Sequence, residues 1–342
     1  MKGERNEPSD AAAAPPVEPA PGVVAVTIVT WESARWLARC LDALAHQTLP
    51  PAEVVVLDNA SCDRSATIAA GHGIVTQVLR QDSNLGFAAG QNRAIRATAA
   101  PWVLVLNPDA FLEPTFLERL LERARVLPRT GALCGKLLRA GDDGAPLAPV
   151  EIDSSGMIVT RAFRHLDRGS GEPDHGQYDT EEAVFGATGA GVLLSRAMLD
   201  DIAVEGEVFD ERFFAYREDA DLAWRAQLLG WDCLYVPRAV GYHVRRVLPE
   251  RRRELPAAIN RASVRNRFLM RIKNADAAVW WRCGWRGLAR DVVVVGGCFA
   301  REWSSLGAFL DVARETPRAL RWRQAIRVRR RRPAAEVAQW FR

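Results

Sequence analysis

Lysine, paired cysteines and long apolar runs are scarce in this sequence of 342 residues. Lysine occurs only at positions 2, 136 and 273, so arginine carries nearly all of the positive charge. Because arginine replaces lysine throughout the chain, a high local arginine content is only partly an indication of a binding function. The six cysteines are scattered singly, without a C-x-x-C pair. This spacing excludes a typical zinc module and is typical of a reduced, cytosolic compartment.

Apolar runs are too short to predict a membrane-spanning helix. The longest uncharged stretch of the C-terminal part, residues 292–300, is far below the roughly 20 residues that cross a bilayer. Residues 1–22 are acidic and rich in Ala and Pro, and they lack the apolar core and cleavage site of a signal peptide. We expect them to form a disordered tail.

The remaining composition is that of an ordinary globular protein. Hydrophobic residues make up 48% and charged residues 26% of the chain, and the formal net charge is +4. The length permits one large or two ordinary domains. Composition therefore limits the class of protein without indicating a function.

From residue 23 onward, short apolar runs alternate with segments of helical periodicity. VVAVTIVT (23–30) predicts a strand, the segment 33–47 a helix, and EVVVLDNAS (53–61) a second strand. The alternation continues to residue 127, which predicts an α/β domain with a largely parallel sheet. In such a domain, ligands bind at the carboxyl ends of the strands.

Polar residues gather at those strand ends. They follow four successive predicted strands and include Thr30, Glu32, Asp58, Asn84, Gly86, Asn107 and Asp109. A turn or a helix cap explains any single one of these residues equally well, but four polar strand ends together favour a binding edge.

Two of these residues carry carboxylates that can bind a specific kind of ligand. Asp58 can accept a hydrogen bond from a nucleobase or a ribose hydroxyl, although it can also shape a turn with Ser61 and Asp63. Asp109 can bind a divalent cation, with His243 at the end of a later predicted strand as a second ligand. The alternative for Asp109 is a turn around Pro108.

A third group of acids begins the predicted helix that ends near Gly230. Glu218, Asp219 and Asp221 are favourable to the helix dipole, and Asp221 can pair with Arg225 one turn later. Three acids in four residues also repel one another, which raises the pKa of at least one of them. Such a group suits a general base that takes a proton from a sugar hydroxyl.

Taken together, these segments resemble the family-2 glycosyltransferases of the GT-A fold, in particular their bacterial rhamnosyltransferase-like branch. The resemblance rests on the strings VTIVTWES, VVVLDNASCDRS, NLGFAAGQNRAI, LNPDA, FDERFFAYREDADLAWR and VPRAVGYH, in this order between residues 23 and 243. It implies a Rossmann-like, mixed and mostly parallel sheet flanked by helices. It also implies inverting transfer of a sugar from a dTDP- or UDP-linked donor, rhamnose among the candidates, to a lipid-linked or polysaccharide acceptor of the cell envelope.

The resemblance also assigns roles to residues. Asp219 matches the catalytic base, with Glu218 and Asp221 beside it, and Asp109 and His243 match the residues that hold Mg²⁺ or Mn²⁺. Two positions depart from the usual pattern, Glu32 in place of Asn and Asn107 in a metal motif that elsewhere has two acids. The donor-binding set is Thr30, Glu32, Asp58, Asn84, Gly86, Asn92, Asp109 and Arg225.

The C-terminal part has a different composition. Residues 321–332 contain seven arginines, and six of the eleven tryptophans lie from position 280 onward. We expect a disordered tail at 1–22, a catalytic domain at 23–245 and a helical extension at 246–342 that attaches to an anionic membrane surface on the cytoplasmic side. The alternative is that these helices pack on the catalytic domain or form a homodimer contact.

Two other functions remain open from the residues alone. A nucleotidyltransferase would need a Gly-rich loop with a basic residue after the first strand, where this chain has TWESARW. A catalytically silent glycan-binding relative would keep the fold without the reaction. Nucleic-acid binding is not expected, because no aromatic-interleaved sheet or helix-turn-helix pattern accompanies the arginines.

Overall fold

The computed structural model describes residues 23–127, 129–245 and 256–342. The predicted tail at 1–22 and the predicted start of the extension at 246 lie outside these residues. Within them, one ten-stranded sheet forms the centre of the molecule, and a separate two-stranded hairpin lies beside it.

The order of strands along the sheet is β10-β12-β6-β11-β4-β1-β2-β3, with β5 beside β12 and β7 beside β6. Strands β1 to β4 run parallel, as do β6 and β12, whereas β11 is antiparallel to both of its neighbours. The predicted mixed, mostly parallel sheet is therefore confirmed. The strands are β1 (Val24–Thr30), β2 (Glu53–Asp58), β3 (Gln77–Arg80), β4 (Trp102–Leu106), β5 (Ala110–Leu112), β6 (Thr130–Arg139), β7 (Ile152–Ser154), β8 (Met157–Val159), β9 (His165–Asp167), β10 (Glu182–Val184), β11 (Gly191–Ser195) and β12 (Asp232–His243).

The apolar strands are buried on both faces because helices cover each side of the sheet. In β4, Leu104 and Leu106 face the cluster formed with α1 and α4, whereas Val103 and Val105 face the cluster formed with α5 and α6. This alternation follows from the two-residue period of a strand. The helices of this part are α1 (Ala34–Ala45), α2 (Ser65–Gly71), α3 (Gly86–Arg96), α4 (Phe116–Ala124), α5 (Arg196–Ile202), η1 (Glu211–Phe213) and α6 (Glu218–Leu228).

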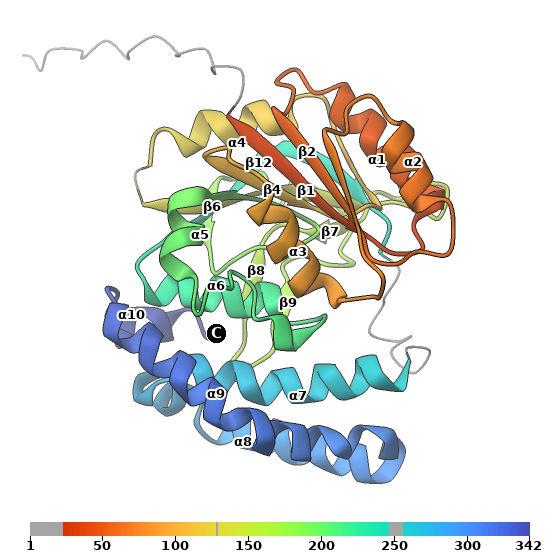
Figure 1. Cartoon of the computed structure of the whole chain (residues 1–342). Coiled ribbons are helices and arrows are strands. Elements are labelled where there is room, and N and C mark those ends of the chain that lie inside the picture. The colour runs from red at the N-terminus through yellow and green to blue at the C-terminus, as the bar shows by residue number, and fades with distance from the viewer. Residues whose placement is uncertain (1–22, 128, 246–255) are drawn as a thin grey trace, which may run out of the picture.

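The C-terminal helices form a further layer beneath α6, on the side away from the sheet (Figure 1). Its segments are α7 (Ala257–Asn274), α8 (Ala277–Arg301), η3 (Trp303–Ser305), α9 (Gly307–Arg329) and α10 (Ala334–Gln339). The helix α8 is interrupted at Gly284, whose φ of 45° is not helical. The helical character predicted for this part is confirmed.

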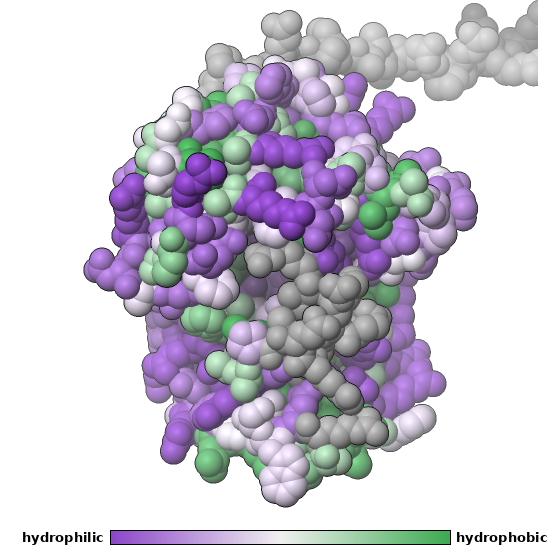
Figure 2. Space-filling model, turned by 90° about the vertical axis from the view of Figure 1, so that its right-hand side faces the viewer, coloured by the Kyte–Doolittle hydropathy of each residue, from purple (hydrophilic) through white to green (hydrophobic). Residues whose placement is uncertain are grey.

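The helix α8 exposes aromatic and aliphatic side chains along its outer face. Trp281 is 91% exposed, Trp285 73% and Val292 72%. Figure 2 shows hydrophobic surface at the lower end of the molecule, the end that α7, α8 and α9 form in Figure 1. In the described part of the chain, no helix is both long and apolar enough to cross a membrane.

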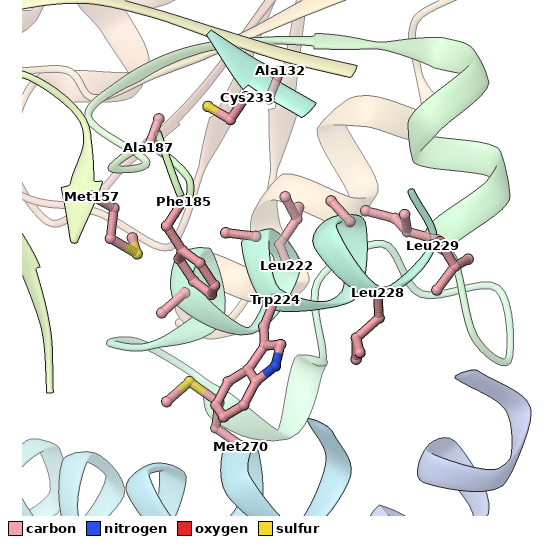
Figure 3. Close-up of a cluster of buried hydrophobic side chains, with 14 of the residues drawn as sticks. Ala132, Met157, Phe185, Ala187, Leu222, Trp224, Leu228, Leu229, Cys233 and Met270 are labelled. Atoms are coloured by element: carbon pink, nitrogen blue, oxygen red, sulfur yellow. The ribbon is translucent and has the colours of Figure 1, made fainter. Parts of the chain in front are cut away.

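The helical layer and α6 share one hydrophobic core. Trp224 of α6 is buried and points toward Met270 of α7 in Figure 3. Its ring also lies 5.0 Å from that of Phe341 near the C-terminus, and all three residues belong to the same cluster. The predicted division of the chain at 245/246 thus marks a change of sequence pattern. The described residues of the catalytic domain and of the C-terminal helices nevertheless pack into one hydrophobic core.

The arginine-rich segment 321–332 is built into this core region. Arg330 pairs with Asp276 at 2.8 Å, and Arg332 pairs with Asp232. Trp322 is fully buried and donates its indole N–H to Glu205 at 3.0 Å. These contacts agree with the packing alternative for this segment, because its cations are largely used inside the molecule.

Candidate active site

A cleft of about 930 Å³ opens where β4 and β12 end and α6 begins. The predicted residues Asp109, His243, Glu218 and Asp219, far apart in sequence, all line it. It is completed by the loop 188–190 before β11, by β9 and by residues 215–217. The structure therefore brings the predicted metal pair and the predicted base into one cavity.

Asp109 and His243 meet because β5 and β12 pair antiparallel. Their register places His243 opposite Ala110, so the imidazole Nε2 lies 3.4 Å from Oδ1 of Asp109. On the other side of the ring, Nδ1 lies 2.9 Å from Oδ2 of Asp153, which Arg245 also binds. A carboxylate that fixes Nδ1 and leaves Nε2 facing a second carboxylate is typical of a metal-binding histidine.

The charges of this group are strongly coupled. Burial opposes a charged imidazole, but the Asp153 and Asp109 carboxylates outweigh it and raise the pKa of His243 to about 10. Burial likewise opposes the charge of Asp153, yet His243 and Arg245 lower its pKa to about 2. Nε2 therefore carries a proton toward Asp109, at a place where a divalent cation could replace it.

The donor set fits a cation that is shared with a substrate. Within the described residues, no group of three or more His, Cys, Asp or Glu side chains comes together to hold a metal ion. Asp109 and His243 would supply one oxygen and one nitrogen, and Mg²⁺ commonly completes such a set with phosphate oxygens and water.

The helix α6 is preceded by a strained turn. Phe214, Tyr216 and Arg217 have φ values of 61°, 68° and 77°, a region that non-glycine residues rarely adopt. The buried amide of Asn266 on α7 stabilises this turn, because its Nδ2 donates to the carbonyls of Phe213, Ala215 and Tyr216 at 2.8, 3.2 and 2.9 Å. The turn thus depends on a helix from the C-terminal layer.

Asp219 is the one residue of α6 that is not buried, and it faces the cleft. Partial burial of its carboxyl, together with the negative charge of Asp167, raises its pKa to about 6. Burial and the neighbouring Asp219 raise the pKa of Glu218 well above its usual range. Of the two, Asp219 is the one that becomes a carboxylate near neutral pH.

Asp221 and Arg225 lie away from the cleft and are fully buried. Asp221 binds Lys273 at 2.9 Å, Asn274 at 2.7 Å and Arg225 at 3.0 Å, and the other two nitrogens of Arg225 donate to the carbonyls of Ile202 and Val208. The predicted catalytic role of Asp221 and donor-binding role of Arg225 are therefore corrected to a structural role. The intrahelical pair that was the alternative for Asp221 is the arrangement observed.

The first two strand ends meet as expected. The parallel register pairs Thr30 with Asp58, and both side chains are buried. Within the described residues, Thr30 Oγ1 and Asp58 Oδ1 have no hydrogen-bond partner, whereas Asp58 Oδ2 accepts from the Ser61 amide at 3.2 Å. Glu32 accepts from the Cys62 amide at 2.6 Å, so it also closes the loop after β2.

Asn84 and Gly86 form the turn before α3. Asn84 Oδ1 accepts from the Asn59 side chain and from the Gly86 amide, both at 2.8 Å. Gly86 has a φ of 81°, and an added Cβ would lie 2.5 Å from the carbonyl oxygen of Phe214. Glycine is therefore required here, because the turn before α6 approaches its backbone closely.

Asn92 has a different position from the one expected. Its buried amide accepts from the Phe209 amide at 2.9 Å and donates to the Phe209 carbonyl at 2.7 Å. Both ends of this amide are used inside the fold, so the predicted donor contact is corrected: Asn92 ties α3 to the segment that leads into α6.

Several side chains of the site were not found by sequence reasoning. Asp153 and Asp167 come from the weakly patterned region after β6, and Asn266 comes from the C-terminal layer. Lys273 had one usable signal, since it is a rare lysine in an arginine-rich chain. The others show no local pattern, because their partners are 50 or more residues away.

Comparison with known proteins gives a family match. Residues 25–190 match the model described as glycosyl transferase family 2. The N-acetylglucosaminyl-diphospho-decaprenol L-rhamnosyltransferase of Mycobacterium tuberculosis is 30% identical over 237 residues, which cover 65% of this chain and 76% of that protein. This match favours a glycosyltransferase over a nucleotidyltransferase.

Solved structures share the fold at lower identity. Staphylococcus aureus TarS 1–349 in complex with UDP-GlcNAc has a TM-score of 0.54 and 16% identity, with coverage of 93% of this chain and 90% of that chain. The mannosyltransferase PcManGT from Pyrobaculum calidifontis, in complex with GDP-Man and Mn²⁺, has a TM-score of 0.51 and 17% identity, with coverage of 98% and 89%. These likenesses confirm the expected GT-A type of fold.

Proposed function

The chain belongs to glycosyltransferase family 2, and from that premise we propose that it moves a sugar from a nucleoside-diphosphate donor to a hydroxyl of a glycan or lipid-linked acceptor, with inversion. The observation that carries this proposal is the single cleft that contains the Asp109–His243 pair and Asp219. The name of the mycobacterial relative supports rhamnose as the first sugar to test, and the UDP-GlcNAc complex of TarS supports a UDP-linked donor, with a dTDP-linked donor as the other candidate. The role that we propose is in cell-envelope glycan synthesis.

Asp219 is the proposed base. Its carboxylate would take the proton of the acceptor hydroxyl while that oxygen forms a bond to the anomeric carbon of the donor sugar. The bond between this carbon and the diphosphate oxygen breaks, and the diphosphate leaves with the electron pair. Because the attack and the departure occur in one in-line displacement, the configuration at the anomeric carbon inverts.

Asp109 and His243 would hold the divalent cation, Mg²⁺ or Mn²⁺. The Mn²⁺ bound together with GDP-Man in PcManGT supports this assignment, as does the carboxylate that fixes His243 from behind. When bound, the cation supplies positive charge that offsets the charge growing on the departing diphosphate.

The nucleoside side of the donor is assigned to the ends of β1 and β2. Thr30 Oγ1 and Asp58 Oδ1 are buried polar atoms without partners among the described residues, and a bound nucleoside would supply the missing hydrogen bonds. Asp58 would accept from the nucleobase, Glu32 would support the same loop, and Asn84 with Gly86 would border the ribose and phosphate side.

We place the protein at the cytoplasmic face of the membrane, attached by the outer face of α8. Exposed Trp281 and Trp285 alternate there with Arg282 and Arg286, which suits a surface with apolar and anionic components. The arginine-rich segment 321–332 is largely used inside the molecule, so α8 replaces it as the expected contact. A homodimer contact through the same face is the competing arrangement.

A thermal-protection screen tests the function. Nucleotide sugars that bind the folded protein raise its melting temperature, because a ligand at 100 times its Kd adds about 2.7 kcal/mol to stability. We expect protection by dTDP- or UDP-sugars that increases with Mn²⁺. The Mn²⁺ dependence should be lost in Asp109→Ala and kept in Asp82→Ala, an exposed aspartate outside the cleft. Equal protection with and without Mn²⁺ in the unmodified protein would contradict the metal assignment.

A further inference from the structure

A second pocket, of about 340 Å³, opens beside the catalytic cleft. The two cavities share His165, Leu166, Tyr216 and Arg217, so they are adjacent along the turn before α6. Ten described residues line this second pocket, of which four are arginines and none is acidic: Arg164, His165, Leu166, Tyr216, Arg217, Ser263, Val264, Arg267, Arg290 and Val294. We call it the basic pocket.

Among the described residues, the arginines at the basic pocket outnumber the carboxylates that pair with them. Asp291 is the carboxylate that pairs with Arg267, at 3.1 Å, and it also serves Arg271 at 2.8 Å. Arg290 makes no ion pair with a described residue, and its buried Nε has no hydrogen-bond partner among them. The carboxylate of Asp291 is therefore shared by two guanidinium groups, and the guanidinium of Arg290 beside them has no ion pair with a described residue. This excess of positive charge makes the pocket complementary to an anion.

The protonation of neighbouring groups agrees with this imbalance. Burial and the charges of Arg217, Arg267 and Arg164 lower the pKa of His165 well below its usual range. Burial and the neighbouring Arg271 lower the pKa of Arg267 to about 10. The pocket thus disfavours further positive charge.

The position of the basic pocket is also informative. On one side it adjoins the cleft that contains Asp219, and on the other side α8 contributes Arg290 and Val294. The opposite face of the same helix exposes Leu288 and Val292, which are 60% and 72% exposed. A catalytic carboxylate, an anion-complementary pocket and an apolar surface therefore follow one another across the molecule.

We propose that the basic pocket binds the phosphate or diphosphate group that links the acceptor sugar to a lipid chain. This inference rests on the proposed function, since it places the sugar hydroxyl near Asp219 and the lipid along α8. Phosphate also occurs in the donor, but Asp109 and His243, which would hold the cation that binds the donor diphosphate, do not line the basic pocket. Arginine suits this task because it binds phosphate through two parallel hydrogen bonds.

Binding of a prenyl diphosphate tests the proposal without sugar transfer. Farnesyl diphosphate and farnesol are titrated by calorimetry without divalent cations into the unmodified protein and into Arg290→Ala and Arg164→Ala. We expect the diphosphate to bind more tightly than farnesol, and each variant to weaken it by about tenfold, as loss of one charge-assisted contact does. Arg314→Ala, which removes a largely exposed arginine of α9, is the control and should change nothing.

Equal binding of farnesol and farnesyl diphosphate, or equal binding by all variants, would overturn the proposal. A second titration with dTDP and Mn²⁺ distinguishes the two sources of phosphate, because the donor should bind Arg290→Ala as it binds the unmodified protein. Displacement of farnesyl diphosphate by dTDP would assign the pocket to the donor and overturn the proposal. Conversely, arginine-dependent binding of farnesyl diphosphate in a protein that binds no nucleotide sugar would contradict the proposed function and leave the basic pocket supported.

Discussion

The two sides of α6 carry carboxylates in opposite environments. On the cleft side, Asp219 has no ion pair with a described basic residue, and its pKa is about 6. On the side toward α7 and α9, Asp221 is fully buried and neutralised by Arg225 and Lys273. The difference teaches that fixed cations commit Asp221 to the fold, whereas Asp219, which lacks them, keeps a raised pKa and can accept a proton near neutral pH.

The largest expected effect is on the cleft side. Asp219→Asn should lower the transfer rate by about a thousandfold, because general-base catalysis contributes roughly 10²–10⁴. Release of nucleoside diphosphate measures the rate. Binding of dTDP with Mn²⁺ should be kept, and transfer at the unmodified rate would remove Asp219 as the base.

The same substitution should leave the fold stable. A carboxyl whose pKa is about 6 in the folded protein, above the ordinary 3.8, binds its proton more tightly when folded. Its stabilising contribution is therefore present below pH 3.8 and lost as the pH rises through 6. The amide that replaces the carboxyl cannot ionise, so the melting temperature of the variant at pH 8 should equal or exceed that of the unmodified protein.

On the buried side, the expected effect is on stability. Asp221→Ala would leave Lys273 and Arg225 buried without their shared carboxylate, and breaking a buried pair in this way typically costs about 3–5 kcal/mol. Urea unfolding measures the loss. A cost below about 1 kcal/mol would contradict this expectation. It would mean that water solvates the two cations, or that Asp210, the other partner of Lys273, compensates for the lost carboxylate.

Substitution of two asparagines of α7 should distinguish the two sides of α6, with smaller effects than those above. Asn266 holds the turn before Asp219, so Asn266→Ala should lower kcat by roughly tenfold while the KM for the donor stays constant. Asn274 binds Asp221, so Asn274→Ala should lower stability and leave kcat near its original value. If both variants lose stability and kcat in the same proportion, Asn266 has no separate positioning role.

The smallest expected effect is a shift in pH dependence. The rate should fall as the pH drops through about 6, because Asp219 must be ionised to act as a base. The charge of Asp167 contributes to that raised pKa, so Asp167→Asn should move this acidic limb to lower pH by less than about one unit. Asp142→Asn, at an exposed site outside the cleft, is the control.

Local sequence patterns were sufficient for the N-terminal parallel strands of the sheet and for part of the site. The apolar runs of β1, β2 and β4 predicted a parallel sheet, and parallel strands necessarily deliver their ends to one edge. This reasoning also anticipated that Asp109 and His243 belong together, although 134 positions separate them in the numbering.

Roles within α6 could not be predicted in the same way. Every residue of this helix except Asp219 is buried, so it lacks the polar face that normally indicates which side meets solvent. The sequence therefore left a role in the site open for Asp221 and Arg225 beside the intrahelical pair that was the alternative. Lys273, which neutralises Asp221 together with Arg225, comes from α7, and a contact between segments about 50 residues apart has no signature in either one.

The packing of Phe341 against Trp224 has a consequence for the order of events during synthesis. The ring of Phe341 lies 5.0 Å from that of Trp224 on the catalytic helix, and the amide of Arg342 donates to the Val159 carbonyl at 3.0 Å. A nascent chain whose sheet has already formed still lacks this support while residue 341 is inside the ribosome. Packing of α6 is thus completed only once the C-terminal helices have been translated, and we expect enzyme shortened by early termination to be recognised by cellular proteases as incompletely folded.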